Sequence, residues 1–123
     1  MNEPDYRVIV CGSREWSNRA LISHSLAALR EQGKKVTIVH GDARGADTLA
    51  ASAAASLGYA VEAYPANWAR FGRGAGPIRN EEMASMGADL CLAFWDGHSK
   101  GTKDMISRAR EHEIPVQLVF ENP

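Results

Sequence analysis

The sequence lacks the features that mark several common classes of protein. Its 123 residues carry 14 Lys and Arg against 15 Asp and Glu, so the strong basic excess of proteins that clamp duplex DNA is missing. No apolar run approaches the length of a membrane span, and residues 1–5 lack the basic-then-apolar layout of a signal peptide. These absences favour a cytoplasmic protein, and we expect neither a membrane nor a nucleic acid as its partner.

Cysteine and histidine are too few and too scattered to suggest a metal site. The two cysteines, Cys11 and Cys91, fall in separate predicted strands, so buried free thiols explain them better than a disulfide or a metal pair. The four histidines show no ligand spacing with one another or with the cysteines. We therefore expect no metal ion and no cofactor.

Apolar runs of strand length alternate with helical patterns along the whole chain, without a repeat or a linker. The predicted strands cover 6–11, 36–40, 60–64, 89–94 and 116–120. The predicted helices between them cover 17–32, 46–57, 78–86 and 102–113. This alternation predicts one α/β domain over residues 1–123, a Rossmann-like three-layer α/β/α sandwich whose five-stranded parallel sheet has the order 3-2-1-4-5.

Three loops that follow predicted strands combine glycine with a basic residue and, in two of them, with small hydroxyl residues. They cover residues 11–16, 41–47 and 96–102. Glycine lets an anion approach the backbone, and the start of the following helix offers free N–H groups and the positive end of its dipole. Because the carboxyl ends of parallel strands share one edge of the sheet, the loops predict a phosphate site there, close to the point where the strand order reverses.

Basic and aromatic residues gather in the same loops. Seven of the 14 basic residues lie in or just after a strand-to-helix loop, namely Arg14, Arg44, Arg70, Arg73, Arg79, Lys100 and Lys103. All three tryptophans, Trp16, Trp68 and Trp95, are there too, and an aromatic face beside phosphate donors suits a nucleobase. We expect a nucleotide or another nucleotide-derived phosphorylated small molecule as ligand, with Trp16 or Trp95 near the base. The expected ligand-binding residues are Gly12, Ser13, Arg14, Trp16, Gly41, Arg44, Gly45, Asp47, Arg79, Asn80, Trp95, Gly97, Ser99, Gly101 and Thr102.

Each of these features also has an ordinary structural explanation. A single glycine-rich turn could only redirect the chain, Asp47 could cap a helix, and each tryptophan could pack at the rim of the core. Arg79 is harder to explain in this way. An arginine at the start of a helix gains nothing from the helix dipole, so an anionic partner accounts for it better.

Four motifs in order resemble the SLOG superfamily, in particular its small YspA-like branch. They are the segment 11–16, the loop 41–47, the helix start with Arg79, Asn80 and Met83, and the turn 97–102. The superfamily unites the Lonely Guy phosphoribohydrolases, which split the N-glycosidic bond of nucleoside 5′-monophosphates, and the DprA/Smf proteins, which bind single-stranded DNA. The resemblance implies a Rossmann-like fold, binding of a nucleotide-related ligand and a homodimer, for which Met83 and Met86 offer apolar surface.

The resemblance breaks at the position of the Lonely Guy catalytic glutamate. That position, three residues after Thr102, is Met105, and methionine can neither move a proton nor stabilise a cationic sugar centre. We therefore expect a binding domain that hydrolyses nucleoside monophosphates poorly. The first alternative is a phosphoribohydrolase that uses Arg79 with a substitute carboxylate, Asp104, Glu82 or Asp47. The second alternative is a DprA-like single-strand binder.

Overall fold

The computed structural model describes residues 5–121. Residues 1–4 and 122–123 lie outside this range, and with them most of the segment 1–5 that lacks a signal-peptide layout. Five strands form one sheet, and they are β1 (Asp5–Gly12), β2 (Lys35–His40), β3 (Ala60–Ala63), β4 (Leu90–Trp95) and β5 (Val116–Phe120). The sheet is parallel throughout and has the order β3-β2-β1-β4-β5, which confirms the predicted fold class and strand order.

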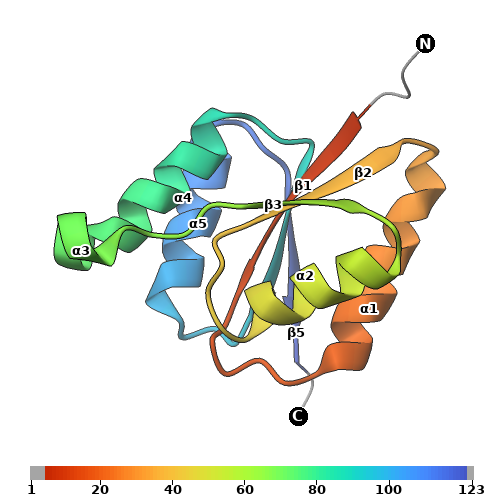
Figure 1. The fold of residues 1–123 in the computed structure, drawn as a ribbon, viewed down its shortest axis with the longest axis horizontal. Helices are drawn as coiled ribbons and strands as arrows, with labels where there is room; N and C mark the ends of the chain where they lie inside the picture. The colour runs from red at the N-terminus through yellow and green to blue at the C-terminus, as the bar shows by residue number, and fades with distance from the viewer. Residues whose placement is uncertain (1–4, 122–123) are drawn as a thin grey trace.

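Helices cover both faces of the sheet (Figure 1). One layer contains α1 (Arg19–Ala27), which continues as the 3₁₀ turn η1 (Ala28–Gln32), and α2 (Ala46–Ser56). The other contains α4 (Ala75–Ser85) and α5 (Lys100–Glu111). The segment between β3 and α4 holds the short helix α3 (Trp68–Phe71) and the 3₁₀ turn η2 (Gly72–Gly74), and Figure 1 places α3 at the outer end of α4.

The central strand β1 explains why the sheet is buried on both faces. Val8 and Val10 pack in the core on the α1 and α2 side, while Ile9 and Cys11 pack in the core on the α4 and α5 side. Alternate side chains of a strand point to opposite faces, so a continuous apolar run is what a doubly covered strand requires. The hydrophobic cores thus fix the sheet and leave its carboxyl edge to the loops.

α2 begins at the predicted residue 46, whereas the other three predicted helix starts differ from the structure by two or three residues. The first helix starts at Arg19, and its N-cap is Asn18, whose side chain accepts a hydrogen bond from the Leu21 N–H at 3.0 Å. α4 begins three residues before the predicted 78, and Pro77 falls in its first turn, where a proline costs no hydrogen bond. Arg79 and Asn80 therefore lie in the middle of α4 and not at a helix start, which corrects their predicted placement. α5 begins at Lys100, two residues before the predicted 102. Within residues 5–121, no helix combines the length and the apolar character that a membrane crossing requires.

Candidate functional site

A cleft of about 430 Å³ opens at the carboxyl edge of the sheet, where the strand order reverses between β1 and β4. Its lining comes from the end of β1, the β2–α2 loop, α4 and the start of α5. The lining residues are Val10, Cys11, Gly12, Arg14, Gly41, Ala43, Asp47, Arg79, Asn80, Met83, Ser99, Lys100, Gly101, Thr102 and Met105. A second, more open compartment of about 570 Å³ shares Arg14, Gly41, Ala43 and Arg79 with it.

Arg79 lies at the junction of the two compartments and is anchored at two points. Its Nη1 donates a hydrogen bond to the carbonyl oxygen of Gly41, and its Nε donates to Oδ1 of Asn80 at 2.9 Å. A Cβ on residue 41 would lie 2.6 Å from Cζ of Arg79, so the guanidinium can lie on this loop only because residue 41 is glycine. Burial lowers the pKa of Arg79 from its ordinary value. Within residues 5–121, Nη2 makes no hydrogen bond, so it can donate to a ligand.

Asn80, in the middle of α4, holds this helix against the start of α5. Its side chain is buried, and its Nδ2 donates to the carbonyl oxygen of Gly101 at 3.3 Å and to Oδ2 of Asp104 at 3.0 Å. Its Oδ1 accepts from Arg79, so the amide uses both ends. Asn80 thereby fixes Arg79 relative to the first turn of α5.

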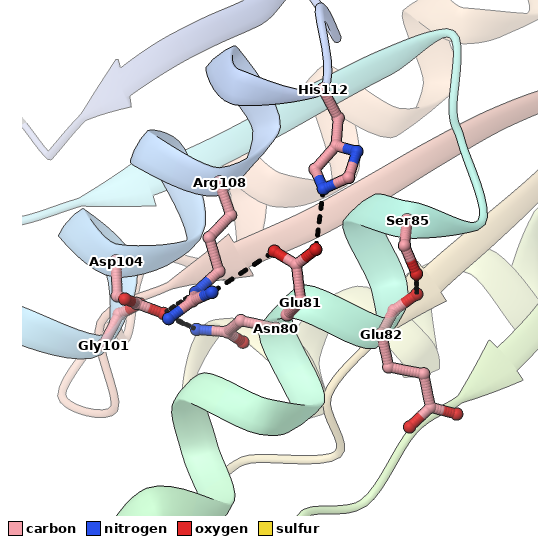
Figure 2. A network of polar contacts seen from close by, with 8 residues as sticks. All are labelled: Asn80, Glu81, Glu82, Ser85, Gly101, Asp104, Arg108 and His112. Atoms are coloured by element: carbon pink, nitrogen blue, oxygen red, sulfur yellow. Dashed lines mark hydrogen bonds and ion pairs between the residues drawn. The ribbon is translucent and has the colours of Figure 1, made fainter.

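A chain of charged side chains continues this contact along α4 and α5 (Figure 2). Oδ2 of Asp104 also accepts from Nε of Arg108 at 2.9 Å, and Nη1 of Arg108 reaches Oε1 of Glu81 at 3.2 Å. The other carboxylate oxygen of Glu81 lies 2.8 Å from Nε2 of His112. Asp104 is therefore part of a helix-to-helix clamp, whereas the carboxylate of Glu82 points away from that clamp in Figure 2.

The first turn of α5 presents free backbone donors to the cleft. Ser99 is the N-cap, but its side chain caps no backbone N–H, and its Oγ accepts instead from Oγ1 of Thr102 at 3.1 Å. The N–H groups of the first helical residues have no partner within a helix, and they carry the positive end of the dipole. Ser99, Lys100, Gly101 and Thr102 all line the cleft, so the helix start and Arg79 face the same space.

Asp47 fastens the loop after β2 and is not the N-cap of α2. The N-cap is Gly45, and Oδ2 of the buried Asp47 reaches back to accept from the N–H groups of Gly41 at 3.0 Å and Ala43 at 3.3 Å. Burial raises the pKa of Asp47 to about 6, although both hydrogen bonds and the charge of Arg79 act to lower it. The carboxyl group thus holds Gly41 in the position that receives Arg79.

The free energy of unfolding should fall as the pH rises from about 4 to about 6, because of Asp47. The folded protein keeps the Asp47 proton up to a pKa of about 6, while the unfolded chain releases it near the ordinary value of 3.8. The difference amounts to about 3 kcal/mol, at about 1.4 kcal/mol for each pKa unit. Urea unfolding of the wild type and Asp47→Asn at the two ends of this range measures it. A stability difference between the two proteins that does not change with pH would contradict the prediction.

Several residues of the glycine-rich loops serve packing. A Cβ on Gly12 would lie 2.6 Å from Cβ of Ala46, so Gly12 allows α2 to start against the end of β1. The hydroxyl of Ser13 is buried and donates to Oδ2 of Asp96 at 3.1 Å, which joins the loops after β1 and β4. Gly97, with φ of 85°, turns the chain and lies outside the lining of the cleft.

The three tryptophans differ in burial and in their distance from the cleft, and only Trp68 lines a compartment, together with Arg44. Trp16 is only 3% exposed, packs edge-on against Phe94 with 5.4 Å between ring centroids, and belongs to the core. Trp95 donates from Nε1 to the Ser99 carbonyl oxygen at 3.1 Å and does not line either compartment. Trp68, in contrast, is half exposed and lines the second compartment together with Arg44. The structure therefore separates Trp16 and Trp95 from the cleft.

The sequence motifs did not predict that apolar residues form the floor of the cleft. Cys11, Met83 and Met105 line the cleft from β1, α4 and α5, and all three are buried. In the sequence these three residues look like ordinary buried positions of a hydrophobic core. Met86, the C-cap residue of α4, is exposed, and the homodimer predicted from Met83 and Met86 stays a prediction. Within residues 5–121, no group of three or more His, Cys, Asp or Glu side chains is placed to hold a metal ion.

Comparison with known proteins finds relatives of both sequence and fold. The Gene 61 protein of Mycobacterium phage D29 is 40% identical over 95% of this chain and 98% of its own length. DNA processing protein A (DprA) from Streptococcus pneumoniae has the same fold, with a TM-score of 0.78 at 20% identity over 95% of this chain. This chain spans only 51% of that protein. DprA from Helicobacter pylori matches with a TM-score of 0.67 at 16% identity, over 98% of this chain and 67% of the other.

The likeness to DprA corrects one expectation from the sequence, the exclusion of nucleic acid as a partner. The H. pylori structure describes a single-stranded DNA binding mode, so the exclusion is wrong for a protein of this fold. The physical reason is that a net charge of −1 averages over the whole surface and does not describe the charge of any one edge. Arg14, Arg44, Arg79 and Lys100 line the two compartments at that edge.

A family model confirms the resemblance seen in the motifs. It matches residues 6–71, which span β1 to α3 and include the loops after β1 and β2. With the 40% identity to the phage protein over nearly the whole chain, this match shows that the chain belongs to the YspA, cpYpsA-related SLOG family.

Proposed function

We propose that this protein binds a nucleotide or a nucleotide-derived ligand in the cleft, with the ligand's phosphate between Arg79 and the first turn of α5. One observation carries the proposal. Among the described residues, Arg79 is held by Gly41 and Asn80 through Nη1 and Nε and has no hydrogen bond at Nη2, and it lines the same cleft as the residues of the uncapped first turn of α5. Positioned cationic donors and a helix start together are a common phosphate site in α/β folds.

The charge of the cleft supports an anionic ligand. Arg14 and Lys100 line it together with Arg79, and the charge of Arg14 adds to burial in lowering the pKa of Arg79. Two cations that repel each other in one cleft are both stabilised by an anion between them. Asp47 is the acidic residue in the lining of the cleft, and its Oδ2 already accepts hydrogen bonds from the N–H groups of Gly41 and Ala43.

Thermal unfolding with a panel of ligands tests this proposal. A ligand that binds only the folded state raises the melting temperature. Nucleoside 5′-monophosphates should raise it, and nucleosides without phosphate should not. Arg110→Ala, which removes an exposed cation near the far end of α5, is the matched control and should respond as the wild type does. A protein whose melting temperature no phosphate ligand changes would contradict the proposal.

The proposed role is binding without efficient hydrolysis. Met105, at the position of the Lonely Guy glutamate, is buried in the floor of the cleft, and Asp104 is engaged by Asn80 and Arg108. We expect no measurable release of base from nucleoside monophosphates by the wild type, and release only from Met105→Glu. Chromatography of the free base measures both. Wild-type turnover that disappears in Asp104→Asn would assign the reaction to that carboxylate and contradict this expectation.

A second candidate function is the binding of single-stranded DNA. The observation that favours it is the open second compartment, where Arg14 and Arg44 continue the cationic lining beyond Arg79. A backbone with several phosphates can follow such a path, and its affinity then falls steeply with salt. Fluorescence anisotropy of labelled oligo-dT over a range of salt concentrations tests it. Binding that does not depend on strand length would favour the mononucleotide.

A further inference from the structure

Trp68 has no structural role that accounts for its exposure. Its side chain is 50% exposed, and it belongs to neither hydrophobic core, whereas Trp16 is 3% exposed and packs on Phe94. The short helix α3 that carries Trp68 begins at Asn67, whose side chain caps it by accepting from the Arg70 N–H at 3.1 Å. A capped turn therefore presents a large aromatic surface to the second compartment.

The ring lies beside the proposed phosphate site. A Cβ on Gly76 would lie 3.5 Å from Cη2 of Trp68 and 3.9 Å from Nη2 of Arg79, so both atoms border the same point of α4. Cζ of Arg14 lies 6.0 Å from the centroid of the Trp68 ring. A side chain at residue 76 would extend into the space bordered by the ring edge and the free guanidinium nitrogen, and glycine leaves that space open. Of the described residues that line the compartments with Arg79, Trp68 is the one aromatic.

We propose that Trp68 is the platform on which the nucleobase of the ligand stacks while its phosphate binds Arg79. This inference rests on the proposed function, and it deepens that function by naming the base-binding residue. Every base offers a π-face, and stacking on an aromatic side chain contributes about 1–3 kcal/mol per base. The ligand class is therefore a unit of base, sugar and phosphate, either free as a mononucleotide or at the end of a single strand.

The geometry also explains why a base would select this tryptophan. Trp16 and Trp95 use their indole N–H groups inside the protein, on the carbonyl oxygens of Asn18 and Ser99. Pro65 and Ala66 line the same compartment as Trp68 and add apolar surface for a flat ligand, while its polar lining includes Arg14, Arg44 and Asp42. The compartment thus combines one aromatic face with cations at its border.

Calorimetry with matched ligands and variants tests the platform. The ligands are AMP, ribose 5-phosphate and a 5′-phosphorylated oligo-dT, and the variants are Trp68→Leu and Trp68→Phe. Trp68→Leu should weaken AMP binding at least about tenfold and leave ribose 5-phosphate unchanged, because only the base loses its contact. Trp68→Phe should retain most of the affinity. Both variants should unfold as the wild type does, because half of the side chain is already exposed.

The outcomes separate this inference from the function on which it rests. Equal wild-type affinities for AMP and ribose 5-phosphate would overturn the platform and leave the phosphate site intact. The absence of binding by all three probes would overturn both. If Trp68→Leu weakens the oligonucleotide more than AMP, the strand is the source of the base, and if it weakens AMP alone, the source is the mononucleotide. Either of these two results supports the platform.

Discussion

Replacing Arg79 with lysine should weaken the binding of a nucleoside 5′-monophosphate by on the order of 100-fold, because hydrogen bonds to charged groups contribute about 1.5–3 kcal/mol each. The planar guanidinium can donate to the Gly41 carbonyl oxygen, to Asn80 and to a phosphate at the same time. A lysine ammonium is a single point of charge and cannot span these three positions. Calorimetry on the folded variant measures the loss.

The control for Arg79→Lys is Arg44→Lys. Arg44 pairs with Glu15 at the surface, where both side chains are largely exposed, so its guanidinium has no fixed position. This variant should change mononucleotide affinity by less than about threefold, since exposed ion pairs contribute little. If Arg79→Lys binds a mononucleotide as tightly as Arg44→Lys does, Arg79 is not the phosphate anchor.

Gly45→Ala should destabilise the protein by roughly 3 kcal/mol or more, because it combines backbone strain with a steric clash. Gly45 has φ of 78°, and a Cβ there would lie 2.5 Å from the carbonyl carbon of Arg14. The loops after β1 and β2 meet at this point, where the Ala46 N–H donates to the Ser13 carbonyl oxygen at 3.1 Å. A methyl group therefore forces two site loops apart.

Gly58→Ala is the matched control for that substitution. Gly58 has nearly the same φ, 77°, but nothing lies within 4 Å of its Cβ position. It should cost only the backbone strain, about 1–2 kcal/mol. Urea unfolding of both variants measures the difference. If the two lose the same stability, the contact between the loops contributes nothing, and the site is not held together in the way described.

The sheet could be predicted from the sequence because its physical cause is local. A strand covered on both faces must be apolar throughout, so β1 and β4 appear as short apolar runs between helical patterns. Glycines and cations after such strands also predict the edge at which the cleft lies. The helix starts were less predictable, because neither α4 nor α5 has a side-chain cap that marks its first residue, and α4 takes Pro77 into its first turn.

The roles of individual loop residues could not be predicted, because they depend on which loops meet. Ser13 and Asp96 are 83 positions apart, and no local sequence pattern predicts the hydrogen bond between them. The same holds for the clamp through Asn80, Asp104 and Arg108, which converts a candidate catalytic carboxylate into a helix contact. Among the tryptophans, only the burial in the folded protein distinguishes Trp68 from Trp16.

A crystal structure of the protein with a bound nucleoside 5′-monophosphate is the most direct test of the proposed site. We predict that the phosphate lies within hydrogen-bond distance of Nη2 of Arg79 and of the N–H groups of Gly101 and Thr102, with the base toward Trp68. A phosphate bound elsewhere, for example in the groove between α1 and α2 lined by Arg19 and Ser23, would contradict the proposal.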